Sequence, residues 1–304
     1  MARYLPALLV VLLLGGSAAA FAVTERLKLE RSPVLATRVD KVVSPVSGQP
    51  AKIRLRLRKR DRLSVVIVDA NDRAVRTLGS ASRPARRWIR VPWDGRDDSG
   101  APVAQGVYRP RLHLSAAHRT ILMPNRIRVD TTAPRIALSG LNLRVFSPDA
   151  DYVRDYLRIR YRASEPVRPV LYANGHVVVK RKVFAAAGAF DWNGRADGLP
   201  RPAGVYKLRL AGIDEAGNAG APTRLFTVRI RYIELARHLI RARAGGRIVV
   251  RVSTDAHPYF WRIGTRRGHA RGRRLSLAAG TPGRYRLVVW TRGHTDRAVV
   301  VVTP

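Results

Sequence analysis

The chain has 304 residues, of which 57 are Lys or Arg and 21 are Asp or Glu, so its formal net charge is +36; it contains no cysteine. The absence of cysteine excludes a disulfide framework, thiol catalysis, a lipidated N-terminal cysteine and any cysteine-type metal site. None of the seven histidines pairs with a glutamate at zincin spacing, and neither a GxSxG elbow nor a phosphate-binding loop occurs. The sequence therefore predicts no catalytic residues and a protein that is not an enzyme.

The basic charge consists mainly of arginine, because only seven of the 57 basic residues are lysine, leaving fifty arginines (57 − 7). One explanation is a GC-rich genome that favours arginine codons and requires no ligand. The other is an anionic partner such as a cell-wall polymer, lipid headgroups or nucleic acid. Composition does not choose between the two.

The N-terminal segment has the layout of an export signal. Arg3 precedes the aliphatic run Leu5–Leu14, and small residues follow up to an A-x-A site at Ala20-Phe21-Ala22. An uncleaved anchor is the rival interpretation, but Arg26, Lys28 and Arg31 after the segment oppose an anchor with its N-terminus inside. We expect a signal peptide or signal anchor over residues 1–22, a linker over residues 23–39, and an extracytoplasmic protein that is secreted or membrane-anchored.

From about residue 40 the chain alternates between apolar and basic residues, which is typical of half-buried strands. In the run Ile53–Arg58 the aliphatic residues fall on one face and Arg54, Arg56 and Arg58 on the other. Short strands with dense turn signals predict an all-β chain of Ig-like or fibronectin-like sandwiches. The arginine faces are candidate binding surfaces for anions, although outward charges also protect sheets from edge-to-edge pairing.

An internal repeat divides the chain. Trp93-Asp94-Gly95-Arg96 precedes Gly106-Val107-Tyr108, and Trp192-Asn193-Gly194-Arg195 precedes Gly204-Val205-Tyr206, with offsets of 99 residues (192 − 93) and 98 residues (206 − 108). Two motifs repeated at nearly one offset indicate a duplicated domain. We therefore expect Ig-like modules over residues 40–130 and 131–232, followed by a small C-terminal β-module over residues 233–304.

The repeated residues have structural roles in this interpretation. The tryptophans close a sandwich edge, the glycines permit a turn with positive φ, and each tyrosine buries its ring while its hydroxyl donates to a loop carbonyl. The predicted structural set is Trp93, Asp94, Gly95, Gly106, Tyr108, Trp192, Asn193, Gly194, Gly204 and Tyr206.

The pattern Trp93–Gly100, followed by Pro102 and Gly106-Val107-Tyr108, resembles the Ig-like domain of the flagellar hook-capping protein. Phe146–Asp155 and Asp214–Asn218 are similar to other secreted bacterial surface modules. The resemblance covers residues 40–232 and implies an Ig-like fold used as a spacer or binder. Hook capping itself does not follow, because an export signal comes first.

Asp149, Asp151 and Asp155 form a D-x-D-x-x-x-D pattern whose closely spaced carboxylates suit calcium. The alternative is an acidic turn that caps strand ends or pairs with arginines. Apart from calcium at this loop, the sequence predicts no cofactor.

Two functions of different class follow. The first is a non-catalytic cell-envelope scaffold or adhesion protein that contacts an anionic envelope polymer, a membrane surface or an envelope protein through arginine faces such as Arg54, Arg56 and Arg58. The second is a carbohydrate-binding accessory module for a separate envelope hydrolase, with Tyr259, Phe260 and Trp261 as the stacking element. Export argues against nucleic acid as the partner, and the oligomeric state stays open.

Overall fold

A computed structural model describes residues 13–17 and 31–304. The export segment expected over residues 1–22 lies outside the described residues, apart from residues 13–17, which are helical. Within the described ranges, no helix has the length and apolarity needed to cross a bilayer. The chain divides into two compact units, Met1–Thr131 and Thr132–Pro304, and each is described by itself.

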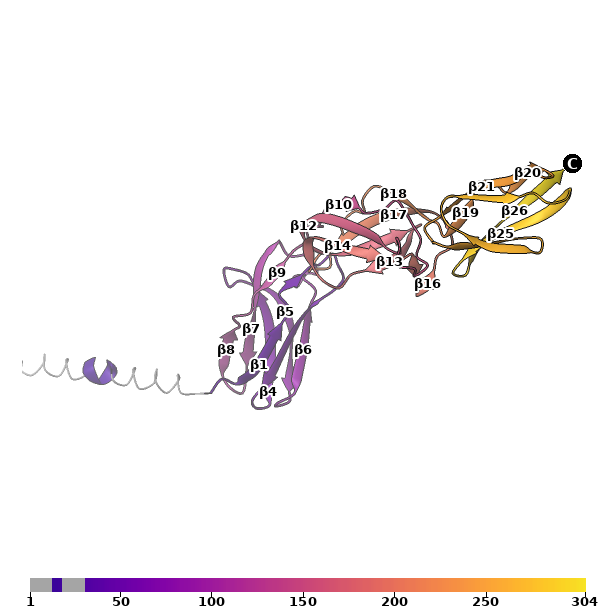
Figure 1. Cartoon of the computed structure of the whole chain (residues 1–304). Coiled ribbons are helices and arrows are strands. Elements are labelled where there is room, and N and C mark those ends of the chain that lie inside the picture. The colour runs from indigo at the N-terminus through magenta and orange to yellow at the C-terminus, as the bar shows by residue number, and fades with distance from the viewer. Residues whose placement is uncertain (1–12, 18–30) are drawn as a thin grey trace, which may run out of the picture. The chain divides into compact units, whose positions relative to one another are not determined.

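The first unit contains a β-sandwich (Figure 1). Its strands are β1 (Val34–Val39), β2 (Val42–Val43), β3 (Ala51–Leu57), β4 (Asp61–Val68), β5 (Ala74–Arg83), β6 (Trp88–Trp93), β7 (Gly106–Leu114), β8 (Arg119–Leu122) and β9 (Ile127–Val129). One sheet has the order β1-β3-β6, and the other has the order β2-β9-β7-β4-β5 with β8 paired to β7. Strand β1 pairs with β3 and belongs to this sandwich, so the linker expected over residues 23–39 was wrong for residues 34–39.

The second sandwich opens the second unit and repeats this plan. Its strands are β10 (Ile136–Leu141), β11 (Val145–Phe146), β12 (Leu157–Ala173), β13 (His176–Lys180), β14 (Ala185–Trp192), β15 (Arg195–Ala196), β16 (Leu199–Pro200), β17 (Gly204–Ile213) and β18 (Phe226–Ile230). The first half of β12 pairs with β10 and β14, and its second half pairs with β13 and β17. The single strand β12 thus takes the places that β3 and β4 hold in the first sandwich, and the register shift between Arg162 and Val167 marks where it changes sheets.

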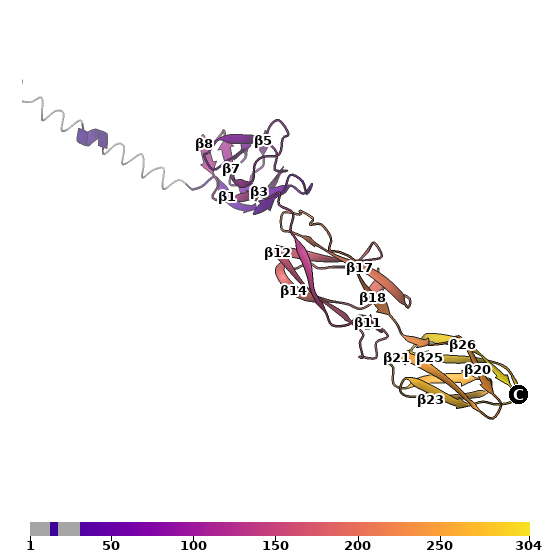
Figure 2. The ribbon, with the colours of Figure 1, turned by 90° about the horizontal axis from the view of Figure 1, so that it is seen from above.

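The C-terminal β-module is a smaller sandwich in the second unit (orange to yellow in Figure 2). Its strands are β19 (Ile233–Leu235), β20 (Leu239–Arg243), β21 (Arg247–Thr254), β22 (Tyr259–Ile263), β23 (Arg266–Ala270), β24 (Arg274–Ala278), β25 (Gly283–Thr291) and β26 (His294–Thr303). The sheets have the orders β19-β21-β24 and β20-β26-β25-β22-β23.

Each sandwich has its own core, because alternate residues of facing sheets point inward. In β3, Ile53, Leu55 and Leu57 are at most 1% exposed, as the alternation predicted. The three cores are built from residues within 43–129, 136–230 plus Tyr232, and 233–302. The predicted all-β sandwich class is confirmed by these sheets.

Candidate functional site

The repeated tryptophans and tyrosines lie in the cores of the first two sandwiches. Trp93 and Trp192 are each 1% exposed, and their indole N–H groups donate to the carbonyls of Arg96 and Arg195 at 2.9 and 2.8 Å. Each ring packs against the tyrosine of its own motif, with Trp93 and Tyr108 centroids 5.4 Å apart and Trp192 and Tyr206 centroids 5.8 Å apart. These aromatic residues are therefore structural.

The hydroxyls of the tyrosines in the Gly-x-Tyr motifs each reach a carbonyl four residues upstream. Tyr108 donates to Ala104 at 2.9 Å and Tyr206 to Pro202 at 2.8 Å. Tyr285 of the third module does the same with Thr281 at 2.9 Å. The buried hydroxyl is thereby satisfied while its ring stays in or against the core.

The motif glycines have positive φ, at +81° for Gly95 and +67° for Gly194, as expected for the turn. A Cβ at Gly194 would lie 2.6 Å from Cγ of Pro148, and one at Gly95 would lie 3.1 Å from Cδ of Pro45. Glycine is thus needed twice over, for the dihedral angle and for close approach to a proline. The Asp94 carboxylate accepts from the N–H of Arg96 and shapes the same turn.

The β3 row consists of Arg54 and Arg56 of β3 and of Arg58, the residue after Leu57, and all three side chains are half-buried. Arg56 donates from Nε and Nη2 to the Arg86 carbonyl at 3.1 and 2.9 Å. Arg58 donates to the Ser32 carbonyl at 3.0 Å, and Arg54 lies 3.8 Å from a carboxylate oxygen of Asp40.

Trp88 completes this arrangement from the neighbouring strand β6. Its ring is 40% exposed, but the guanidinium groups of Arg38 and Arg56 lie 5.4 and 5.7 Å from its centroid. Such cation–π contacts stabilise both partners. Arg56 and Arg58 therefore serve the first sandwich itself, because their guanidinium groups already donate to its carbonyls. Arg54 is held less firmly, since its Nε has no hydrogen-bond partner among the described residues.

A second set of arginines lies at the β19-β21-β24 sheet of the third module, with Arg251 and Arg274 in its strands and Arg237 and Arg273 in the adjoining segments. We call the hollow of about 610 Å³ lined by Arg237, Arg251, Arg273 and Arg274 the arginine groove; its remaining lining residues are Ala236, Val249 and Val250. All four arginines are exposed, and no carboxylate is among the residues that line the hollow. Across the described chain, none of their guanidinium groups makes a hydrogen bond or an ion pair.

The strand register explains why these charges come together. Arg251 of β21 lies directly opposite Arg274 of β24, and Val249 lies opposite Ser276 on the same outward face. Like charges directly opposite one another destabilise a strand pair. Arg251 and Arg273 also line an adjacent cleft of about 160 Å³ together with Arg154 and Arg231, and Asp255 is the one carboxylate among the residues that line it.

The stretch Tyr259-Phe260-Trp261 does not form the expected stacking platform. Tyr259 is 0% exposed and lies in the third core, and its hydroxyl finds no hydrogen-bond partner, so its assignment as a binding residue was wrong. Trp261 packs against the same core. Only Phe260, at 44% exposed, faces outward, where it stacks on Trp290 with centroids 5.7 Å apart.

The predicted metal ligands are brought together. Carboxylate oxygens of Asp149, Asp151 and Asp155 lie within 4.8 Å of one another in the loop between β11 and β12. Asp155 accepts from the N–H groups of Ala150 and Tyr152, at 2.8 and 2.7 Å. The loop turns through positive φ at Ala150, Tyr152 and Arg154.

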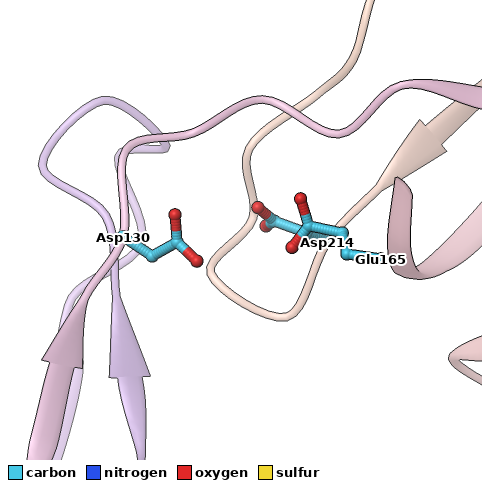
Figure 3. Close-up of side chains that lie close together, drawn as sticks. All are labelled: Asp130, Glu165 and Asp214. Carbon is cyan, nitrogen blue, oxygen red and sulfur yellow. The ribbon is translucent and has the colours of Figure 1, made fainter. Parts of the chain in front are cut away.

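A further pair of carboxylates lies in the second unit. Glu165 of β12 and Asp214, in the loop after β17, have oxygens within 4.8 Å of each other (Figure 3). Asp214 is 1% exposed and accepts from the backbone and side-chain nitrogens of Asn218, both at 2.8 Å. These bonds close the Asp214–Asn218 turn, which gives this carboxylate a structural role.

The sequence analysis missed the arginine groove. Residues 233–304 contain fifteen arginines and three carboxylates, an imbalance that identifies this module as the most basic candidate. Trp290 was also missed, because its contact with Phe260 depends on the pairing of β22 with β25.

Comparisons with known proteins concern the fold. No family model matches the chain, and no curated protein matches it. Among solved structures, the fibronectin(III)-like modules of Clostridium thermocellum CbhA match at 14% identity over 64% of this chain and 93% of that chain, with a TM-score of 0.35. A bacterial ice-binding adhesin matches at 13% identity over 90% of this chain and 99% of that one (TM-score 0.27), and three Ig domains of titin match at 10% identity over the same shares (TM-score 0.26).

Proposed function

We propose that this chain is a non-catalytic, extracytoplasmic β-sandwich protein of the cell envelope that binds an anionic polymer through the arginine groove of its third module. The observation that carries the proposal is the facing pair Arg251 and Arg274, exposed and without any carboxylate in the groove. An anion on this face relieves their mutual repulsion, so the interaction is favourable at a surface that is otherwise electrostatically strained.

The first two sandwiches support the scaffold part of the proposal. Their repeated tryptophans and tyrosines are buried in the cores, and each tryptophan N–H donates to the carbonyl of the turn that follows it. We assign these sandwiches to the Ig-like domain type of the hook-capping protein, which they resemble in sequence, and give them the role of spacers. The export segment would place the chain outside the cytoplasm, in contact with wall polymers and lipid headgroups.

The test is the binding of the purified chain to immobilised dextran sulfate and to neutral dextran over a salt series. We expect retention on dextran sulfate at low salt that falls steeply as salt rises, because each neutralised anionic group releases counterions. Equal retention on both polymers, or retention that salt does not change, would contradict the proposal. The same salt series with isolated cell envelopes then tests whether retention on the natural surface has the same salt dependence as retention on the anionic polymer.

Carbohydrate binding is the second candidate, favoured by the exposed Phe260–Trp290 stack. Phe260 lines a hollow of about 530 Å³ that also contains Asp255, His257 and Arg292. Stacking on a neutral sugar survives high salt, unlike charge-driven binding. If the chain binds a neutral glycan at high salt and Phe260→Ala abolishes this binding, the Phe260–Trp290 stack is the binding site in place of the arginine groove.

A further inference from the structure

The acidic loop between β11 and β12 lies where the second sandwich meets the third module. Arg292, in the turn between β25 and β26, donates to the carbonyl of Ala150 in this loop. Beside it, the rings of Tyr232 and His294 stack with centroids 3.4 Å apart and planes 3° from parallel. The loop is therefore part of the junction between two modules of one compact unit.

Asp149 is the unusual member of the loop. It is only 9% exposed, yet neither of its carboxylate oxygens has a hydrogen-bond partner among the residues that the structure describes. Both oxygens are inaccessible to solvent, and the carboxylate lies within 4.8 Å of those of Asp151 and Asp155. A buried carboxylate without partners is costly, because water no longer solvates the charge and nothing replaces it.

A fourth carboxylate approaches from the third module. Asp255 follows β21 and lines the same hollow of about 530 Å³ as Asp151. Its Oδ1 has no hydrogen-bond partner among the described residues, and the Ser147 hydroxyl approaches this carboxyl without reaching hydrogen-bond geometry. Burial, and then the charges of Asp151, Asp255 and Asp155, raise the pKa of Asp149 to about 6. The nearby N–H of Asp151 lowers the pKa of Asp149 and so offsets this rise in part, but it does not reach hydrogen-bond geometry.

Arginine does not neutralise this cluster, although the chain has 57 basic residues against 21 acidic ones. Within the part of the chain that the structure describes, none of Asp149, Asp151, Asp155 and Asp255 forms an ion pair. Arg154 lies near enough to lower the pKa of Asp255, which burial raises more strongly, but it does not bond to it. Arg292 donates to a backbone carbonyl instead of a carboxylate.

We propose that Asp149, Asp151 and Asp155 bind a calcium ion and that Asp255 of the third module joins the site, so that the ion couples the second sandwich to the third module. Calcium accepts six to eight oxygen ligands in flexible geometry, which suits a loop that offers several carboxylates. Magnesium demands a tighter octahedron and gives up its water reluctantly. The ion supplies the counter-charge that the arginines leave missing.

The first test is calcium titration of the full chain by isothermal titration calorimetry, with thermal unfolding in calcium and in EGTA. We expect one site per chain with a Kd of about 0.1–1 mM, the range of extracellular modules, and a rise in melting temperature of about 5 °C at saturating calcium. The absence of heat and of any melting shift at 10 mM calcium would overturn the proposal.

Two variants test whether calcium acts at this site or at acidic residues elsewhere in the chain. Asp149→Asn should abolish the calcium-induced shift and should melt at a higher temperature than the wild type in EGTA, because it removes the unpartnered buried charge. Asp94→Asn is the matched control, since the second copy already has Asn193 at this position. It should keep the full shift; a shift that survives in Asp149→Asn would overturn the assignment.

The coupling is tested separately. Because the chain has no cysteine, Lys207→Cys and Arg284→Cys, both at exposed positions, allow one spin label on each module. We expect calcium to narrow the distance distribution measured by pulsed electron spin resonance, and Asp255→Asn to remove the narrowing and weaken calcium binding at least tenfold. A distribution that calcium leaves unchanged would overturn the role of Asp255 as the link between modules.

Discussion

The arginines of the first sandwich and those of the third module occupy the same kind of position in their strands but have opposite surroundings. Both sheets place arginines opposite each other, Arg54 facing Arg90 in one and Arg251 facing Arg274 in the other. In the β3 row, the Asp40 carboxylate, the Trp88 ring and two backbone carbonyls occupy the guanidinium groups. In the arginine groove, no group of the residues that the structure describes does so.

The difference suggests a rule: exposure and partners, more than the number of charges, separate an arginine with a structural role from one that is free to meet a ligand. A guanidinium that already donates to carbonyls must break those bonds before it meets a ligand, and its removal affects stability. An unpaired, solvated guanidinium contributes little to stability and remains free to bind an anion. The comparison therefore predicts that changes in the two regions affect different properties.

The largest effect is expected from the groove variant Arg237→Gln, Arg251→Gln and Arg274→Gln. At about 1 kcal/mol per arginine near an anionic surface, the affinity for dextran sulfate should fall about a hundredfold. The melting temperature should change little, because these side chains make no bonds within the fold. Binding is measured at fixed low salt. An affinity within twofold of the wild type would contradict the distinction between the β3 row and the arginine groove.

The second-largest effect is expected on the free energy of unfolding, from a substitution in the β3 row. Arg56→Gln loses two hydrogen bonds to the Arg86 carbonyl and the cation–π contact with Trp88, which should cost about 1–2 kcal/mol of unfolding free energy. Affinity for dextran sulfate should stay unchanged. Urea unfolding of the full chain measures the first quantity, and a loss of binding without loss of stability would reverse the roles given to row and groove.

The variant Tyr259→Phe tests whether an aromatic residue of the third module, and not the arginine groove, takes part in ligand binding. Because the Tyr259 hydroxyl is buried without a partner, its removal should raise the free energy of unfolding by about 1 kcal/mol. Tyr285→Phe is the matched control and should lower it by about the same amount, since its hydroxyl bonds to Thr281. Decreased stability in Tyr259→Phe, or loss of ligand binding, would show that this hydroxyl has a function.

The smallest effect is expected at Arg54. Its contact with Asp40 is 3.8 Å long, and both side chains are more than a third exposed, so the ion pair contributes little. Asp40 also keeps its bond from the Lys52 N–H. Arg54→Gln should therefore change the free energy of unfolding by less than about 0.5 kcal/mol. A loss comparable to that of Arg56→Gln would mean that charge, and not the Arg86 and Trp88 contacts, organises the row.

Much of the fold was predictable from local sequence. Alternation identified the inward residues Ile53, Leu55 and Leu57, and the repeated motifs placed Trp93, Trp192 and both tyrosines in cores. These features depend on residues near one another in the chain. Strand β1 was missed because the residues Val34–Val39 show no regular alternation of apolar and polar side chains, and its place in the sheet depends on pairing with β3.

The candidate sites were less predictable because they depend on contacts between distant residues. The bonds that occupy Arg56 and Arg58 come from carbonyls 30 and 26 residues away. The groove combines Arg237, Arg251 and Arg274 from three segments, and the proposed calcium site would take Asp255 from the next module. The alternation of side chains along a strand predicted that Tyr259 and Phe260 face opposite sides, but it did not predict which of the two faces the core.

The most direct test of the central claim compares the salt dependence of dextran sulfate binding by three proteins. These are the wild type, the groove variant, and a row variant with Arg54→Gln, Arg56→Gln and Arg58→Gln. The slope of log K against log salt should shrink by about 2–3 in the groove variant, because about three counterion-releasing contacts are lost, and should be unchanged in the row variant. A slope that shrinks in the row variant and stays constant in the groove variant would contradict the account.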